Sequence, residues 1–120
     1  MQGRVLIVED DKHQANALKG YLELEGLAVE TTGDGQTALQ RLAIGDWDIV
    51  LSDLRLPDMN GLEVFKRVRE QRGEEAPAFL ILTAFGTVLS AREALKAGVF
   101  DYLTKPVDAS ELALLVGKAL

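Results

Sequence analysis

The chain has 120 residues, of which 48% are hydrophobic and 27% are charged, which predicts one soluble globular domain over residues 1–120 and excludes a disordered chain. The absence of cysteine excludes disulfides, thiolate metal sites and thiol catalysis. The formal net charge of −6 argues against direct nucleic-acid binding, because nucleic-acid-binding domains usually carry a basic face.

The first part of the chain predicts two strand–helix pairs. The apolar run at residues 4–8 is typical of a buried strand, and the helical spacing that follows it stops at Gly26. Residues 27–31 predict a second, weaker strand. After a turn at residues 33–35, apolar residues at helical spacing predict a short helix that ends at Gly45.

Two further strand–helix pairs follow. Residues 47–52 predict the third strand, and a loop at residues 56–61 separates it from a helix with apolar residues at helical spacing. Residues 79–82 predict the fourth strand. The helix over residues 89–97 is expected to end at Gly98, because glycine readily adopts the left-handed conformation that closes a helix.

The last pair is a strand at residues 100–103 and a helix that runs to the end of the chain. Asp108 is suited to cap this helix, and Glu111 is placed to reach back to the cap. Five strand–helix repeats predict a parallel α/β sheet with helices on both faces, because parallel strands need right-handed crossover connections.

The chain carries no signal for a membrane. No stretch approaches the roughly 20 apolar residues of a transmembrane helix. The apolar run at residues 5–8 is too short for a signal peptide, and charged residues follow it at once. We therefore expect a cytoplasmic protein with no membrane partner.

Polar residues follow four of the five predicted strands. Glu9 and Asp10 follow the first, Asp53 ends the third, Thr83 ends the fourth and Lys105 lies beyond the fifth. In an open parallel sheet, the carboxyl ends of the strands meet at one edge, where ligands bind. Carboxylates gathered there repel one another unless they are protonated or share a cation, and an all-oxygen set favours Mg²⁺.

Lys105 and Thr83 are poor metal ligands, but both can contact phosphoryl oxygens. A metal ion on one side and hydrogen-bond donors on the other is the arrangement that phosphoryl transfer needs. Each residue alone has an ordinary structural explanation; Asp11, for example, is expected simply to cap the first helix. Their joint occurrence at the ends of four strands is what favours a phosphoryl-transfer site.

Four segments together resemble the receiver domain of two-component response regulators: residues 5–11 (VLIVEDD), 51–61 (LSDLRLPDMNG), 82–84 (LTA) and 100–106 (FDYLTKP). The resemblance covers essentially the whole chain. It implies a flavodoxin-like (CheY-like) doubly wound fold, in which a five-stranded parallel sheet of order 2-1-3-4-5 lies between two layers of helices.

The stretch from residue 83 to residue 98 resembles more narrowly the receivers of nitrogen-regulator-type enhancer-binding activators. In that group an ATPase domain and a DNA-binding domain follow the receiver. The chain is expected to be either an excised receiver or a stand-alone one, and its end within a predicted helix at Leu120 favours the excised receiver.

The resemblance implies a role for each residue at the sheet edge. A sensor histidine kinase or a phosphotransfer protein donates a phosphoryl group to Asp53. Asp10 and Asp53 bind Mg²⁺ directly, Glu9 supports it through water, and the Arg55 backbone carbonyl supplies a further ligand. Lys105 pairs with the phosphoryl group.

The resemblance also implies a switch. Thr83 moves toward the phosphoryl group, Tyr102 changes rotamer with it, and the surface of the fourth helix, fifth strand and fifth helix changes to control an output domain or partner in transcription. Such a domain is a signalling switch rather than an enzyme. The Lys105–Pro106 bond is often cis in this family, and Arg55 and Phe85 are bulky at positions that tune phosphoryl lifetime.

The last helix is apolar nearly all round, because residues 112–116 are all hydrophobic. An apolar helix needs cover on every side. We expect its outer face to pack against a second copy, giving a homodimer, or against a downstream segment.

Three other functions remain open from the residues alone. A Mg²⁺-dependent phosphatase that works through an aspartyl-phosphate commonly has a second aspartate two residues after the nucleophile, where this chain has Arg55. A flavodoxin-like cofactor binder needs a Gly-, Ser- or Thr-rich phosphate loop, where this chain has Glu9, Asp10 and Asp11. A degenerate receiver would signal without phosphate, although every key position is filled.

Overall fold

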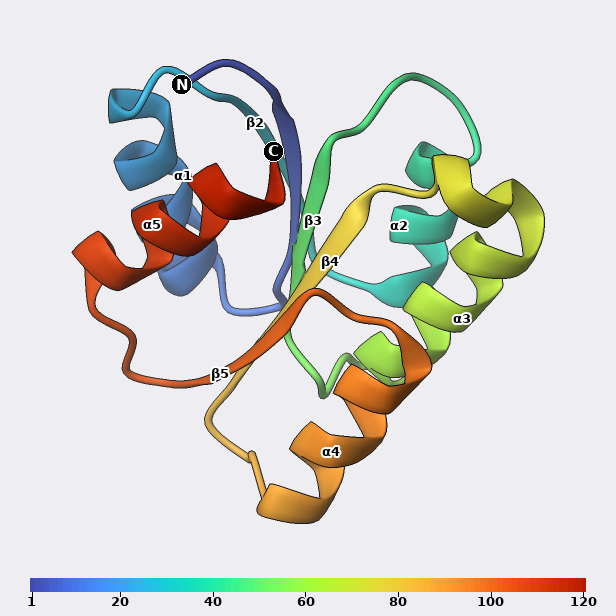
Figure 1. The fold of residues 1–120 in the computed structure, drawn as a ribbon. Coiled ribbons are helices and arrows are strands. Elements are labelled where there is room, and N and C mark those ends of the chain that lie inside the picture. The colour runs from blue at the N-terminus through green and yellow to red at the C-terminus, as the bar shows by residue number, and fades with distance from the viewer.

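Five parallel strands form the central sheet of the computed structural model, which describes residues 1–120 (Figure 1). Their order is β2-β1-β3-β4-β5, which confirms the predicted α/β fold and topology. The strands are β1 (Arg4–Val8), β2 (Ala28–Thr32), β3 (Ile49–Ser52), β4 (Ala78–Thr83) and β5 (Asp101–Thr104).

Helices cover both faces of the sheet. In Figure 1, α1 and α5 lie on one face, whereas α2, α3 and α4 lie on the other. A short 3₁₀ helix (Gly73–Glu75) follows α3. None of the helices combines the length and the apolar character needed to cross a bilayer. The helices are α1 (Lys12–Leu24), α2 (Gly35–Leu42), α3 (Gly61–Arg72), α4 (Val88–Ala97) and α5 (Ala109–Ala119).

The sheet separates two hydrophobic cores, because side chains alternate between its faces. Leu6 and Val8 of β1 belong to the core that also contains Val64 of α3, whereas Val5 and Ile7 belong to the core on the α1 and α5 side. All four β1 residues are at most 1% exposed. A strand buried on both faces reads as a continuous apolar run, which is why β1 was predictable to the residue.

Polar side chains cap the N-termini of the helices. Asp11 caps α1 by accepting hydrogen bonds from the backbone N–H groups of His13 and Gln14, as expected. Asp108 caps α5 through the Ser110 backbone N–H, but the predicted return contact from Glu111 is not formed. Capping side chains satisfy backbone donors that have no partner inside the helix.

Several predicted boundaries were wrong by one to three residues. Strands β2 and β5 each begin and end one residue later than expected, and β3 begins at Ile49 rather than Trp47. The Trp47 indole N–H instead donates to the Arg41 carbonyl at 3.0 Å. The predicted end of α4 is confirmed, because Gly98 adopts a left-handed conformation with φ of +116°.

Candidate functional site

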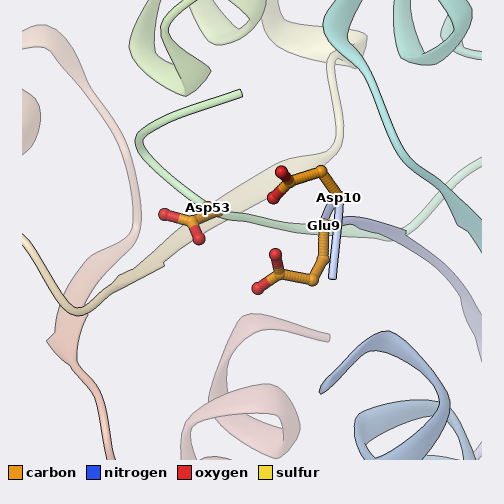
Figure 2. A group of neighbouring side chains, drawn as sticks. All are labelled: Glu9, Asp10 and Asp53. Atoms are coloured by element: carbon orange, nitrogen blue, oxygen red, sulfur yellow. The ribbon is translucent and has the colours of Figure 1, made fainter. Parts of the chain in front are cut away.

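Three carboxylates lie together at the carboxyl ends of β1 and β3. The ligand oxygens of Glu9, Asp10 and Asp53 all lie within 4.8 Å of one another. Figure 2 shows the Glu9 and Asp10 side chains, which are neighbours in the chain, directed toward the side on which Asp53 lies. Glu9 and Asp53 are buried, at 5% and 8% exposure, whereas Asp10 is exposed.

The Lys105 ammonium group enters this cluster from the loop after β5. Its Nζ lies 3.1 Å from Asp53 Oδ2 and also donates to Glu9 Oε1 and, at 2.5 Å, to Gln14 Oε1. The Lys105 side chain is only 15% exposed, so water screens these contacts weakly. The Lys105–Pro106 peptide bond is cis, as the family resemblance implied.

The pKa values of Glu9 and Lys105 are both raised, in agreement with burial at Glu9 and against it at Lys105. Burial raises the pKa of the Glu9 carboxyl more than the hydrogen bonds from Lys105 and the Asp11 backbone lower it. Burial alone would lower the pKa of Lys105, yet its hydrogen bonds to Glu9 and Asp53 outweigh that effect and raise it. Lys105 is therefore held as a cation.

The backbone around Asp53 is held tightly. The Asp53 backbone N–H donates to the Val8 carbonyl at 2.9 Å, which continues the β1–β3 pairing to the site. Asp53 Oδ1 accepts from the Arg55 N–H at 3.3 Å. A Cβ atom at Gly61 would lie 2.2 Å from the Asp53 carbonyl oxygen, so only glycine permits this approach of α3 to the site.

Thr83 is fully buried at the end of β4, beside the Lys105 backbone. Its Oγ1 accepts from the Phe85 N–H at 3.1 Å, and its carbonyl accepts from the Lys105 N–H at 2.9 Å. Tyr102 is half-buried, and its hydroxyl lies 2.8 Å from Ser90 Oγ in α4. The predicted switch residues therefore lie on the two neighbouring strands β4 and β5.

Arg55 and Phe85 connect the β3–α3 and β4–α4 loops. The guanidinium carbon of Arg55 lies 4.1 Å from the centre of the Phe85 ring, within cation–π range. Both side chains are exposed. The structure therefore joins these two residues directly, which their separation in sequence did not indicate.

All five residues predicted for the sheet edge lie there, with Lys105 in contact with Glu9 and Asp53. Sequence reasoning missed Gln14 and Ser90. Gln14 lies in the first turn of α1, where its only sequence signal is its position after the Asp11 cap. Ser90 had no signal, because a serine inside a helix is ordinarily a solvent-facing residue.

The model of the response regulator receiver domain family matches residues 5–116. The regulatory protein AtoC of Escherichia coli is 38% identical over 98% of this chain and 25% of its own length. The transcriptional regulatory protein DltR of Streptococcus agalactiae is 41% identical over 91% of this chain and 48% of its own length. The chain thus spans between a quarter and a half of these relatives.

Solved structures agree with this assignment. The receiver domain of the Francisella response regulator 1452 superposes with a TM-score of 0.90 at 31% identity, covering 98% of this chain and 95% of that one. The beryllofluoride-activated NtrC4 receiver domain dimer also superposes with a TM-score of 0.90, at 25% identity, covering 97% of this chain and 94% of that one. The chain belongs to the response regulator receiver domain family and is a receiver domain of two-component signal transduction.

Proposed function

We propose that Asp53 is the phosphoacceptor of this receiver domain and that its modification switches the surface formed by α4, β5 and α5. One observation carries the proposal: the Asp53 carboxylate lies 3.1 Å from Lys105 Nζ and shares a cluster with Glu9 and Asp10. A nucleophilic carboxylate between a fixed cation and further carboxylates has the surroundings that phosphoryl transfer needs.

In the proposed reaction, an Asp53 carboxylate oxygen attacks the phosphorus of a phosphohistidine on the donor protein. The oxygen–phosphorus bond forms as the phosphorus–nitrogen bond breaks, and the histidine nitrogen keeps the electron pair. Lys105 offsets negative charge on the transferred group, because it is already held as a cation beside Asp53. Thr83, whose backbone carbonyl accepts from the Lys105 N–H, supplies a hydroxyl for contact with the phosphoryl group.

The acidic cluster fits a divalent cation. It gathers three carboxylates, of which Lys105 contacts two, Glu9 and Asp53, so an excess of negative charge remains. The donors are all oxygens, which Mg²⁺ prefers. We propose that Asp10, Asp53 and the Arg55 backbone carbonyl bind Mg²⁺ directly and that Glu9 supports it through water. Bound Mg²⁺ would neutralise charge on the phosphoryl oxygens.

We propose a cytoplasmic signalling switch that is not an enzyme, with a sensor histidine kinase or phosphotransfer protein as its donor. The names of AtoC and DltR mark them as regulatory proteins, which supports transcriptional control through an output domain. The NtrC4 receiver is described as a dimer. Leu114 on α5 is 60% exposed, which supports the proposal that this helix takes part in a homodimer.

Intact-mass analysis tests the central proposal. The chain is incubated with Mg²⁺ and acetyl phosphate, and we expect a mass increase of one phosphoryl group. Asp53→Asn should show no increase, whereas Asp11→Asn, which changes a nearby helix cap, should be modified like the wild type. Equal modification of wild type and Asp53→Asn would contradict the assignment of the phosphoacceptor.

A further inference from the structure

The loop that follows Asp53 is tied to the start of α2 by one side chain. The two carboxylate oxygens of Asp58 accept hydrogen bonds from the backbone N–H groups of Gly35, at 2.8 Å, and Gln36, at 2.9 Å. The cap residue of α2 itself, Asp34, accepts only from the Thr37 N–H, at 2.6 Å. The first turn of α2 is therefore capped by two residues: Asp34, which directly precedes the helix, and Asp58, which lies in the β3–α3 loop.

A second side chain of the same loop packs against the same turn. A Cβ atom at Gly35 would lie 2.3 Å from Met59 Cγ and 2.6 Å from Met59 Sδ. Gly35 is buried, so Met59 lies directly on its backbone. Hydrogen bonds from Asp58 and packing by Met59 thus hold two consecutive loop residues against α2.

On the β3 side, the loop that contains Asp58 and Met59 is connected to the acidic cluster through Arg55. The loop is closed by an antiparallel bridge between Arg55 and Asn60 and by a hydrogen bond from the Leu56 N–H to the Met59 carbonyl at 3.1 Å. Asp58 and Met59 thus lie inside a loop whose two ends are paired with each other. Fixing Asp58 and Met59 therefore fixes Arg55, which is two residues from Asp53.

The other end of the attachment borders the β1 side of the cluster. The Glu9 N–H donates to the Thr32 carbonyl at 2.9 Å, and a Cβ atom at Gly33 would lie 3.8 Å from the Cα atom of Asp10. The turn between β2 and α2 thus lies against the segment that carries Glu9 and Asp10. Asp58 is the side chain that connects this turn to the loop after Asp53.

We propose that Asp58 is a positioning residue for the cation site, in addition to being a helix cap. It joins the loop after Asp53 to the start of α2, next to the turn that lies against the segment of Glu9 and Asp10. In this way it holds the cluster oxygens at a separation that suits one divalent ion. This inference rests on the proposed Mg²⁺ site. Asp58 itself binds neither the ion nor the phosphoryl group; it acts through the loop.

The test compares two cap variants of the same helix, Asp58→Ala and Asp34→Ala. Each removes one carboxylate and at least one hydrogen bond from the first turn of α2, so each should lower the melting temperature by about 3–6 °C. Mg²⁺ binding is then measured by isothermal titration calorimetry without a phosphodonor. We expect Asp58→Ala to weaken Mg²⁺ binding about tenfold, by analogy with residues that orient metal ligands, and Asp34→Ala to change it less than about twofold.

Two further variants separate positioning from charge. Asp58→Asn keeps the shape and one acceptor oxygen, so its Mg²⁺ affinity should lie between those of wild type and Asp58→Ala. Gly35→Ala keeps every charge but displaces Met59, and it should also weaken Mg²⁺ binding.

The two proposals fail in different ways. A wild-type chain that binds no Mg²⁺ would overturn the proposed cation site and this inference with it. A wild-type chain that binds Mg²⁺, with Asp58→Ala and Asp34→Ala weakened equally, would overturn the positioning role alone.

Discussion

The Tyr102 hydroxyl on β5 lies 2.8 Å from Ser90 Oγ in the first turn of α4. Ser90 also forms the capping box of α4 with Thr87, in which each residue accepts a backbone hydrogen bond from the other. Gly86 leaves room for the ring, because a Cβ atom there would lie 3.1 Å from Tyr102 Cε1. The position of Tyr102 is therefore coupled to the start of α4.

This coupling predicts that Tyr102→Phe reduces stability by about 1 kcal/mol, because it removes one half-buried hydrogen bond and leaves the ring in place. Ser90→Ala should reduce it further, because the capping box is lost as well. Urea unfolding of both variants and the double variant gives the coupling energy, which we expect to be about 0.5–1 kcal/mol. Strictly additive effects would show that the two hydroxyls do not interact.

Thr83→Ala should still accept a phosphoryl group but lose most of the response in α4. Moving a switch from mostly inactive to mostly active needs about 5.5 kcal/mol, and one charge-assisted hydrogen bond supplies about 1.5–3 kcal/mol. Losing the Thr83 hydroxyl should thus reduce the active-to-inactive ratio about tenfold or more. Hydrogen exchange of α4 with and without acetyl phosphate measures this response.

Thr83→Ser is the matched control, because it keeps the hydroxyl and should respond like the wild type. An α4 response of equal size in Thr83→Ala and wild type would remove Thr83 from the switch.

The fold and the edge that carries the site were predictable because their signals are local. Buried parallel strands such as β1 are continuous apolar runs, and Gly98 marks a helix end through its own backbone conformation. Once all strands are parallel, Asp10, Asp53 and Lys105 must lie at the same edge. No knowledge of side-chain conformations is needed for these steps.

Side-chain contacts that connect separate segments of the chain were not predictable. Asp58 lies in a segment whose composition indicates only a loop, and its bonds to the Gly35 and Gln36 N–H groups depend on how two loops close. The contact of Arg55 with Phe85 depends in the same way on rotamers at two distant positions. Neither has a periodicity or spacing that a sequence could reveal.

The Asp108 cap makes the stability of α5 depend on acid pH. Hydrogen bonds from the Ser110 hydroxyl, at 2.6 Å, and from its backbone N–H, at 2.7 Å, hold the pKa of the Asp108 carboxyl below its usual range. A lowered pKa in the folded state means that the stabilisation is complete above the unfolded pKa of about 3.9 and is lost as pH falls through the folded value.

Asp108→Asn should therefore melt about 2–4 °C below the wild type near neutral pH, because asparagine caps the helix without the charge. The difference should begin to shrink below the unfolded pKa of about 3.9 and should be lost as the pH falls through the lower pKa of the folded Asp108 carboxyl. Melting curves of both proteins between pH 7 and pH 3 measure this. A difference that stays constant over that range would contradict a contribution from the charge of Asp108.

The stack of Arg55 on Phe85 bridges the loops that follow Asp53 and Thr83, and we expect it to restrict the access of water to a phosphorylated Asp53. If water attacks only when the stack is open, losing a surface cation–π contact of about 0.5–1 kcal/mol should speed hydrolysis about two- to fivefold. Phe85→Ala and Arg55→Ala should each show this increase. The double variant should be no faster than the faster single variant, because both changes remove one contact.

Val88→Ala is the control for this experiment, because Val88 is the first residue of α4 after the same loop, is 79% exposed and makes no such stack. The decay of the phosphorylated mass after removal of acetyl phosphate gives the rate for each protein. Half-lives of Phe85→Ala and Arg55→Ala equal to that of Val88→Ala would show that the stack leaves water access unchanged. An additive increase in the double variant would instead mean that the two side chains act separately, Arg55 through its charge and Phe85 through its bulk.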